Sequence, residues 1–356
     1  MGVSLKMGDK DYVKICHARD NKFTKDEQKR ISSLIDNELF PRTFDFPLTL
    51  QFELTTHCNV RCKHCYNNSG VANTKKDRMG ASEWKEFAKY LVKKGGIFQC
   101  VISGGEPLLM GDDLFEIMDI LHNDGTSFLV ISNCFLMTQE KAKRFSKYRY
   151  QWFQVSIDGA TPEVHDEFRQ RSGSWERAIK GAYMLSKEGI PLTIAHSVNP
   201  QNVSQIEDMC KLAYELGAGS IILGEITPSG RSANNHELLL NYEQKNFLYR
   251  KAEELAQYYA GRMRVQRSST VRNQLKRYMN TPNSGAIIRP NGDIRLDCMA
   301  PFVIGNVLDE DFQQIWLQKG GTCWENPEVI KYAESYNEDD DINVAYKNYF
   351  DEDIHI

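Results

Sequence analysis

The chain has no apolar run near the roughly 18 residues that mark a membrane-spanning helix, and it has no secretory signal segment. It lacks a basic surplus: 44 Lys and Arg stand against 48 Asp and Glu, and the net charge of −4 gives no electrostatic argument for nucleic-acid binding. Its nine cysteines are an odd number, which does not suit a disulfide scaffold in a chain of 356 residues. We therefore expect a globular protein of the reducing cytoplasm that acts on neither membranes nor nucleic acids.

Apolar strand segments alternate with helical segments along the chain, and no solenoid repeat or low-complexity tract interrupts them. We expect strands at residues 48–54, 99–103, 127–132, 152–157, 191–197 and 220–224. We expect helices between them at residues 81–94, 113–124, 138–147, 174–188 and 203–216. This order predicts an α/β fold with a parallel sheet, right-handed crossovers and functional groups at the carboxyl ends of the strands. Residues 1–47 precede it as an extension with a helix at 24–40.

Three cysteines follow the first predicted strand at C-x3-C-x2-C spacing: Cys58, Cys62 and Cys65. Cysteine thiolates hold iron–sulfur clusters, usually four to a cluster. Three thiolates on one loop would leave one iron open to a substrate or cofactor. A structural zinc site is the alternative, with His57 or His64 as the fourth ligand.

A second motif, Gly104-Gly105-Glu106-Pro107, follows the second predicted strand. Two glycines allow close backbone approach to a ligand, and a carboxylate pairs with an ammonium group. By itself, a Gly-Gly pair before proline indicates only a turn.

Taken together, the two motifs resemble the radical SAM superfamily, in which they follow the first two strands of a partial barrel. The resemblance implies a partial (β/α)6 TIM-like barrel over residues 48–235. It implies a [4Fe-4S] cluster whose ligands are Cys58, Cys62 and Cys65. It also implies that S-adenosylmethionine (SAM) binds with its amino group at Gly104, Gly105 and Glu106.

Other predicted strand ends carry residues similar to those of the family. The resemblance implies that Ser156 and Arg169 bind the SAM carboxylate, and a guanidinium suits that group. Asp158 would orient its loop or reach the ribose, although Asp158-Gly159 also reads as a plain turn and Arg169 as a solvated helix residue.

Two further positions relate to the same cofactor. Asn133 either faces it or is a turn residue, and Cys134 replaces a glycine of the family pattern, which leaves the backbone conformation of that loop open. His64 stands where relatives often carry an aromatic residue whose backbone meets adenine.

The C-terminal part, residues 236–356, resembles the SPASM/twitch subgroup, which adds a small α+β domain with auxiliary iron–sulfur clusters. Asn291-Gly292 independently predicts a hairpin turn there. The cysteine set is incomplete, since only Cys298 and Cys323 follow Cys210, so we favour loss of the auxiliary cluster over a cluster with unusual ligands. Cys16, Cys100 and Cys210 are expected to be buried, and the acidic tail after residue 337 to be solvated rather than docked.

The resemblance implies an enzyme that cleaves SAM reductively and removes a hydrogen atom from a substrate, with flavodoxin or ferredoxin as electron donor. We expect a ribosomally made peptide as substrate, with crosslinking, oxidation or epimerisation as the outcome. A sugar or antibiotic small molecule is the alternative. A third possibility, from a different class of function, is a non-enzymatic module that binds zinc or an iron–sulfur cluster. Cys298 is either a catalytic thiol that returns a hydrogen atom to the substrate or a buried apolar residue.

Overall fold

Parallel strands alternating with helices form the body of the structure, a computed structural model that describes residues 44–70, 77–233, 235–280, 284–335 and 353–356. The chain divides after Phe44, and the described residues from Asp45 onward belong to the unit Asp45–Ile356. The predicted helix at 24–40, Cys16 and the acidic stretch at 338–341 lie outside the described residues.

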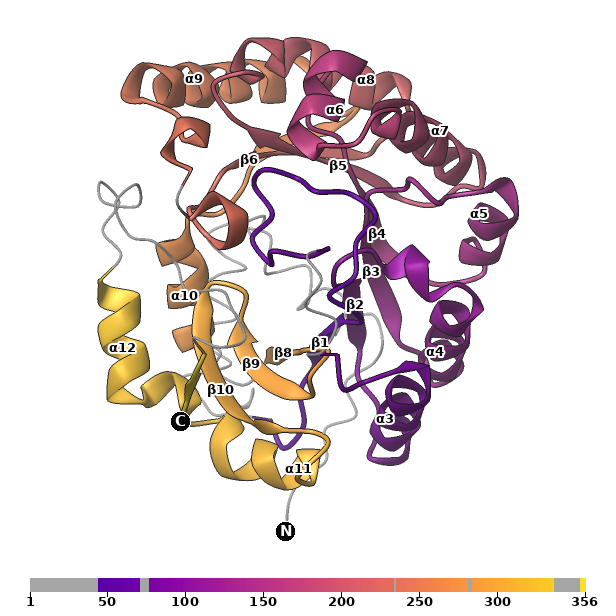
Figure 1. Ribbon diagram of the computed structural model, residues 1–356, viewed down its shortest axis with the longest axis vertical. Helices are drawn as coiled ribbons and strands as arrows, with labels where there is room; N and C mark the ends of the chain where they lie inside the picture. Colours follow the sequence, from indigo (N-terminus) through magenta and orange to yellow (C-terminus); the bar gives the residue numbers. More distant parts are fainter. Residues whose placement is uncertain (1–43, 71–76, 234, 281–283, 336–352) are drawn as a thin grey trace. The chain divides into compact units, whose positions relative to one another are not determined.

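The predicted α/β fold with a partial barrel is confirmed. The first six strands are β1 (Thr49–Glu53), β2 (Gln99–Ser103), β3 (Ser127–Ser132), β4 (Tyr150–Ser156), β5 (Leu192–Val198) and β6 (Ser220–Glu225). Each pairs in parallel with the next, and β7 (Arg264–Arg267), which the sequence pattern did not reveal, continues the parallel order after β6. The sheet curves, and its helices line the outer side of the curve (Figure 1).

The connecting helices are α3 (Ala81–Lys93), α4 (Asp112–Asn123), α5 (Gln139–Phe145), α6 (Pro162–Arg169), α7 (Ser174–Lys187), α8 (Ile206–Glu215) and α9 (Tyr242–Tyr258). Five of these match predicted helices to within a few residues; α6 and α9 were not predicted. The helix expected at 203–216 is split into a short 3-10 turn, Val203–Gln205, followed by α8.

Alternation along β1 decides which side chains face the barrel. Leu50 and Phe52 are fully buried, and Phe52 packs against Trp84 of α3 with ring centroids 4.9 Å apart. Side chains alternate across a strand, so Gln51 and Glu53 point to the opposite, inner face. Glu53 is nevertheless only 1% exposed, which places a carboxylate inside the fold at the carboxyl end of β1.

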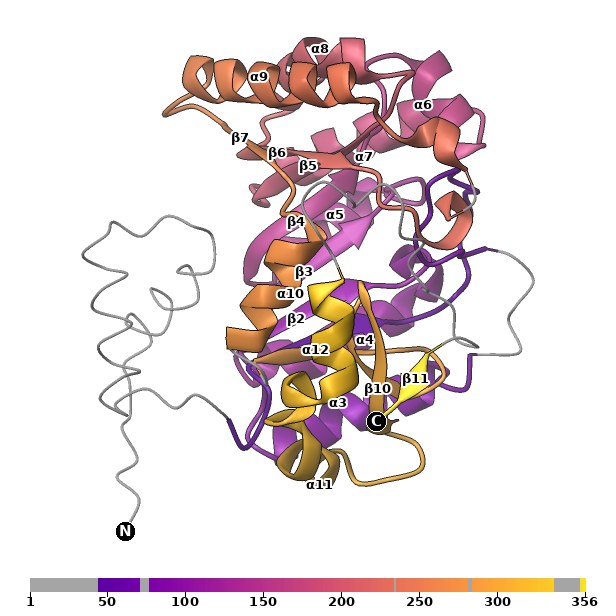
Figure 2. The same ribbon diagram turned by 90° about the vertical axis from the view of Figure 1, so that its left-hand side faces the viewer.

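The C-terminal strands join the same sheet on the other side of β1. They are β8 (Gly285–Ile288), β9 (Asp293–Asp297), β10 (Ala300–Asn306) and the short β11 (Ile354–His355). β8 is parallel to β1, the predicted hairpin connects β8 to antiparallel β9, and β11 is parallel to β10. Helices α10 (Val271–Asn280) and α12 (Pro327–Glu334) lie side by side against this extension, and α11 (Phe312–Ile315) follows β10 (Figure 2).

The domain boundary at residues 235 and 236 stays a prediction, because both parts contribute to one continuous sheet. Among the described residues, no helix has the length and apolar character required to cross a membrane. Cys100 and Cys210 are fully buried, as predicted.

Candidate active site

The cysteine loop begins directly after β1 and is fixed there by Asp77. The carboxylate of Asp77 accepts hydrogen bonds from the hydroxyl groups of Thr55 and Thr56, at 2.8 and 2.7 Å, and from the main-chain N–H of Thr56 at 2.9 Å. These bonds satisfy polar groups that the end of the strand would otherwise leave without partners. The start of the loop therefore has a defined path before the first cysteine.

Arg231, after β6, holds the other end of the cysteine loop. Its guanidinium donates to the main-chain oxygen of Cys62 at 2.8 Å, to the oxygen of Ser69 at 2.7 Å and to the side chain of Asn68 at 3.2 Å. The preceding Gly230 has a φ of +57°, and a side chain there would collide with the main-chain oxygen of Cys65. These contacts make Gly230 and Arg231 a positioning element of the loop.

The three thiols lie close enough on this loop to affect one another electrostatically. Burial, together with Glu106, raises the pKa of Cys58 to about 12, and burial raises the pKa of Cys62 to about 11. Two N–H groups point at sulfur atoms, Ser69 N–H at Cys65 over 3.4 Å and the Asn133 amide at Cys58 over 3.8 Å. Donors of this kind tune iron–sulfur clusters.

This environment fits a positively charged metal cluster, because buried thiolates need a compensating charge. Within the ranges that the structure describes, no three His, Cys, Asp or Glu side chains are already gathered as a group able to hold a metal ion. The three cysteines are free thiols on this loop and are the residues that would hold a cluster.

The glycine motif after β2 lies against the cysteine loop. Gly105 N–H donates to the main-chain oxygen of Thr55 at 2.6 Å, and Glu106 N–H donates to that of His57 at 2.8 Å. Gly104 has a φ of +128°, and a side chain at Gly105 would collide with the oxygen of His57. The glycines are therefore required for the two loops to meet, whatever ligand they also approach.

Glu106 is 1% exposed and accepts hydrogen bonds from three described groups: the Ser132 hydroxyl at 2.7 Å, Asn133 N–H at 2.8 Å and Leu108 N–H at 3.1 Å. Burial raises the pKa of Glu106, and these donors oppose that effect. A carboxylate has about four acceptor positions, so one remains for a ligand. That position suits a cation such as an ammonium group.

Asp158 and Arg169 form a buried ion pair beside the cysteine loop. Nε and Nη2 of Arg169 both donate to Oδ2 of Asp158, at 2.8 and 2.6 Å, and Ser197 N–H donates to Oδ1 at 2.7 Å. Burial would raise the pKa of Asp158, but the Arg169 guanidinium overcomes it and holds that pKa well below its usual range. Asp158 and Arg169 thus stabilise the local structure as a pair. Arg169 also acts electrostatically on Cys62 and Glu106.

His64 stacks on Phe168, with ring centroids 4.4 Å apart, and its Nε2 lies 3.9 Å from Asp158. Burial lowers the pKa of His64 to about 4, so the ring is neutral at neutral pH. Ser156 ends β4 half-buried. Cys134 has a φ of 55°, so the loop after β3 keeps a glycine-like, left-handed turn with cysteine in the glycine position.

The structure therefore brings most of the predicted residues to one edge of the sheet: the cysteine triplet, the glycine motif, Asn133, Ser156, Asp158, Arg169 and His64. Cys298 belongs to a different part of the chain, after β9, where its sulfur is 3.7 Å from the Gln274 amide and 3.6 Å from Oδ1 of Asp297. Burial, with Asp297, raises the pKa of Cys298 well above its usual value, so it is a neutral thiol. It also interacts electrostatically with Tyr66, whose hydroxyl donates to Glu53 at 3.1 Å.

Comparison with known proteins also points to the radical SAM superfamily. Residues 52–213 match the family model described as the radical SAM superfamily. The subtilosin biosynthesis protein AlbA of Bacillus subtilis is 30% identical over 213 residues, which cover 56% of this chain and 46% of AlbA. An AdoMet-dependent heme synthase of Methanosarcina barkeri is 32% identical over 192 residues, 54% of each chain. The chain thus spans about half the length of these curated relatives.

Among solved structures, Streptococcus suis SuiB bound to S-adenosylmethionine superposes with a TM-score of 0.64 at 14% sequence identity. The match covers 93% of this chain and 75% of SuiB. At that identity the likeness concerns the fold, and it extends over the C-terminal strands as well as the barrel.

Proposed function

We propose that this chain removes a hydrogen atom from a peptide substrate. The premise is that it belongs to the radical SAM superfamily and is an enzyme of that family. The family implies a [4Fe-4S] cluster and SAM. When reduced by a one-electron donor such as ferredoxin or flavodoxin, this pair supplies reductive cleavage of SAM to methionine and a 5′-deoxyadenosyl radical. The observation that supports the assignment most is the convergence of the cysteine loop, the glycine motif and the Asp158–Arg169 pair at one sheet edge.

In this proposal the chain's own residues bind and orient the two groups. Cys58, Cys62 and Cys65 hold the cluster, and Arg231 fixes the loop that carries them. Glu106 binds the SAM ammonium through its remaining acceptor position, with Gly104 and Gly105 allowing the approach.

The remaining site residues meet the other parts of SAM. Ser156 and Arg169 face the SAM carboxylate, Asp158 holds Arg169 in place, and Asn133 lies beside Cys58. His64 contributes its backbone near the adenine. The auxiliary cluster is absent in this proposal, since only Cys298 and Cys323 follow Cys210 in the sequence and two thiolates do not complete a four-cysteine site.

The peptide substrate rests on the relatives. AlbA is named for biosynthesis of a bacteriocin, and SuiB has a structure bound to its precursor peptide SuiA. The second candidate is a small molecule, which the match to an AdoMet-dependent heme synthase supports at a similar identity. The membership of an enzyme family argues against the non-enzymatic metal module.

Anaerobic reconstitution with iron and sulfide, followed by dithionite and SAM, tests the assignment. Wild type should form 5′-deoxyadenosine, and the variant with Cys58, Cys62 and Cys65 all changed to Ala should not. The matched control changes Cys100 and Cys210 to Ala, since both are fully buried and lie on β2 and α8 rather than on the cysteine loop. Cleavage of SAM by the triple variant at the wild-type rate would refute the proposal.

A further inference from the structure

Two exposed arginines cover the ring of Phe135, which lies in the loop after β3. The guanidinium carbon of Arg171 is 4.9 Å from the centroid of the Phe135 ring, and that of Arg177 is 5.8 Å from it. Both arginines are exposed, whereas Phe135 is half-buried. We call these three residues the arginine surface. Cation–π attraction holds a guanidinium over an aromatic face and leaves its outer side available to a partner.

Three elements bring the arginine surface together. Phe135 follows Cys134 in the loop after β3, Arg171 follows helix α6, and Arg177 belongs to α7. Helix α7 approaches the β3 loop closely at Gly181, where a side chain would collide with that of Cys134. Absence of a side chain at this one position allows the helix and the loop to meet. The arginine surface therefore rests on packed elements of the barrel.

The arginine surface carries an uncompensated positive charge. Among the residues that the structure describes, neither of its two arginines forms an ion pair. The acidic side chains nearest to them in sequence already have partners: Glu167 pairs with Lys63 at 2.9 Å, Glu176 pairs with Lys180 at 2.6 Å, and Asp166 accepts bonds from the first residues of α7. The whole chain has a net charge of −4, so this surface is a local exception. It favours a negatively charged partner.

A short path joins the arginine surface to the first cysteine of the loop. Phe135 N–H donates to the side-chain oxygen of Asn133 at 2.9 Å, and Nδ2 of Asn133 lies 3.8 Å from the sulfur of Cys58. Asn133 is buried, so it alone separates the main chain of Phe135 from a proposed cluster ligand. The end of α6 also contacts the cysteine loop, because Arg61 N–H donates to the main-chain oxygen of Arg169 at 3.1 Å.

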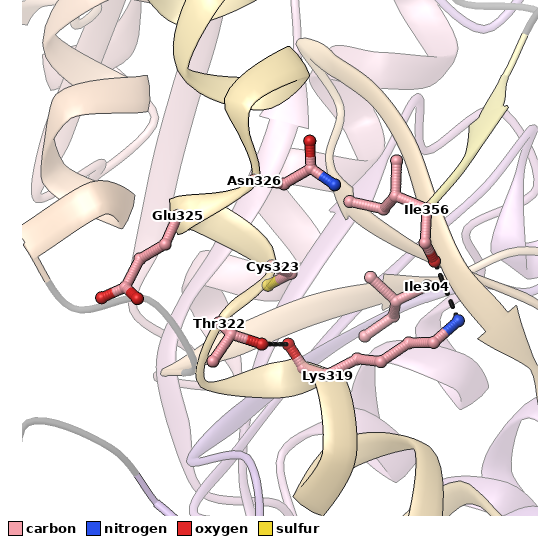
Figure 3. A pocket seen from close by; sticks show the side chains of 7 residues that line it. All are labelled: Ile304, Lys319, Thr322, Cys323, Glu325, Asn326 and Ile356. Carbon is pink, nitrogen blue, oxygen red and sulfur yellow. Dashed lines mark hydrogen bonds between the residues drawn. The ribbon is translucent and has the colours of Figure 1, made fainter.

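An exposed cation of the C-terminal part does not offer the same combination. Lys319 borders an open pocket of about 320 Å³ that is also lined by Cys323 and Ile356 (Figure 3). Its Nζ donates to the main-chain oxygen of Ile356 at 2.8 Å, so its charge is already engaged. Available charge and a short path to Cys58 together distinguish the arginine surface.

We propose that the arginine surface docks an acidic one-electron carrier protein, such as a flavodoxin or ferredoxin, which reduces the cluster held by the cysteine loop. This rests on the proposed function, because the electron needs that cluster as its acceptor. One electron leaves the carrier, which is oxidised, and enters the cluster, which is reduced; no bond forms or breaks. Redox encounters bury little area and are steered by charge, which suits two arginines around one aromatic ring.

Reduction of the reconstituted, full chain by flavodoxin hydroquinone tests the docking. The double variant Arg171→Glu/Arg177→Glu should be reduced at least roughly tenfold more slowly than wild type at low ionic strength, as followed by anaerobic stopped-flow absorbance. Excess dithionite should still reduce its cluster fully. The wild-type rate should fall steeply with added salt, a result that needs no variant. A variant as fast as wild type, or a wild-type rate that salt does not change, would overturn the proposal.

The matched control is Arg250→Glu/Lys276→Glu, which makes the same change in net charge at exposed cations of α9 and α10. This control should keep the wild-type rate with flavodoxin. Slowing equal to that of the Arg171→Glu/Arg177→Glu variant would show that only the total charge matters, and would reject docking at this surface.

Binding of oxidised flavodoxin, which passes no electron, separates this proposal from the proposed function. Calorimetry at low ionic strength should show at least roughly tenfold weaker binding to the Arg171→Glu/Arg177→Glu variant than to wild type. That result in a protein that cleaves no SAM would refute only the proposed function. Equal binding to both chains would refute the docking, even in a protein that cleaves SAM. A hexaglutamate peptide that binds the two arginines more tightly than flavodoxin does would assign the surface to an acidic peptide and would also overturn the proposal.

Discussion

Nε of Arg231 donates a hydrogen bond of 2.8 Å to the main-chain oxygen of Cys62, which joins the end of β6 to the loop after β1. Strands β1 and β6 are separated along the curve of the sheet by β2 to β5, so this bond joins distant parts of the barrel (Figure 1). A hydrogen bond to a charged donor contributes about 1.5–3 kcal/mol, and removal of the donor leaves a carbonyl without its partner. The cysteine loop thus has a defined shape before any cluster binds.

Arg231→Met should therefore weaken binding of the cluster more than it lowers the stability of the fold. We expect reconstituted protein to lose iron to a chelator several times faster than wild type, as followed by its absorbance near the visible iron–sulfur band. Arg250→Met is the matched control, because Arg250 is exposed on α9. Equal rates of iron loss in the two variants would show that the loop does not depend on Arg231.

Glu106→Gln should weaken SAM binding by about 1.5–3 kcal/mol, since it removes the charge opposite the ammonium group. Isothermal titration of the reconstituted protein measures this. Ser132→Ala is the control: it removes a hydrogen bond of 2.7 Å to the same carboxylate but leaves its charge, so SAM affinity should change little. Wild-type affinity in Glu106→Gln would mean that the SAM amino group binds elsewhere.

An alanine substitution is not a suitable test of whether Arg169 contributes to SAM binding. Because it is paired with buried Asp158, Arg169→Ala would leave a carboxylate without compensation and destabilise the fold by about 3–5 kcal/mol. Arg169→Lys keeps the charge and loses the fork. A contribution to SAM binding should appear there as weaker affinity with little change in the free energy of unfolding.

The sequence was informative where local pattern decides structure. The six predicted strands lie within two residues of β1 to β6, because alternation of apolar residues and turn signals marks strand ends. The cysteine triplet and glycine motif lie at one sheet edge as expected, since parallel strands present their carboxyl ends together. The roles of these residues stay predictions.

What the sequence could not provide were pairings between distant segments. Asp353 was expected to be part of a solvated tail, and that expectation was wrong: its carboxylate is buried against Arg289, 64 positions away. Neither hydrophobic periodicity nor a motif records which arginine a lone aspartate will meet. The same holds for Arg231, because two of its partners are main-chain oxygens, which every residue has.

Acid should destabilise the cluster-free protein through His165. Its Nδ1 accepts a hydrogen bond of 3.0 Å from Asp158 N–H, and burial, with Arg169, lowers its pKa to about 3. The folded state keeps this ring neutral while the unfolded chain binds a proton below about pH 6.5, so stability falls as pH decreases from about 6.5 toward 3. At pH 5 the loss from this group is about 2 kcal/mol.

Urea unfolding at pH 7.5 and pH 5 measures this loss. His165→Asn should reduce the difference between the two pH values, because the amide oxygen can accept the same bond without titrating. His236→Asn, at an exposed position, should not change it. An undiminished pH dependence in His165→Asn would assign the effect to other groups.

Reconstituted wild type should contain about four iron atoms per chain, the content of a single [4Fe-4S] cluster. The Cys323 thiol donates to the oxygen of Gly320 at 3.3 Å, and Cys298 lies beside Gln274, so each already has a local partner. Cys298→Ala and Cys323→Ala should leave the iron content unchanged, and Cys58→Ala should lower it. A content near eight would demonstrate a second cluster.

Cys298 should return a hydrogen atom to the substrate radical: its S–H bond breaks, the C–H bond forms, and the thiyl radical left on sulfur takes one electron from the ferredoxin or flavodoxin donor and a proton from water. A thiol donates hydrogen only when protonated, and burial, with the adjacent Asp297, keeps Cys298 neutral by raising its pKa well above the usual value. Cys298 also acts electrostatically on Tyr66, the residue that follows the last cysteine of the loop. Because a thiol exchanges its proton with water, wild type in deuterated buffer should place solvent deuterium in the product.

Cys298→Ala should still form 5′-deoxyadenosine but should not complete the product, since the substrate radical then lacks its donor. Cys323→Ala is the matched control, a buried cysteine of the same C-terminal part that lies beneath Ile356. Its product yield and deuterium content should equal those of wild type, as measured by mass spectrometry. If Cys298→Ala instead gives the full yield, the thiol only packs, and the reaction is a crosslink or an oxidation in which an electron leaves the substrate.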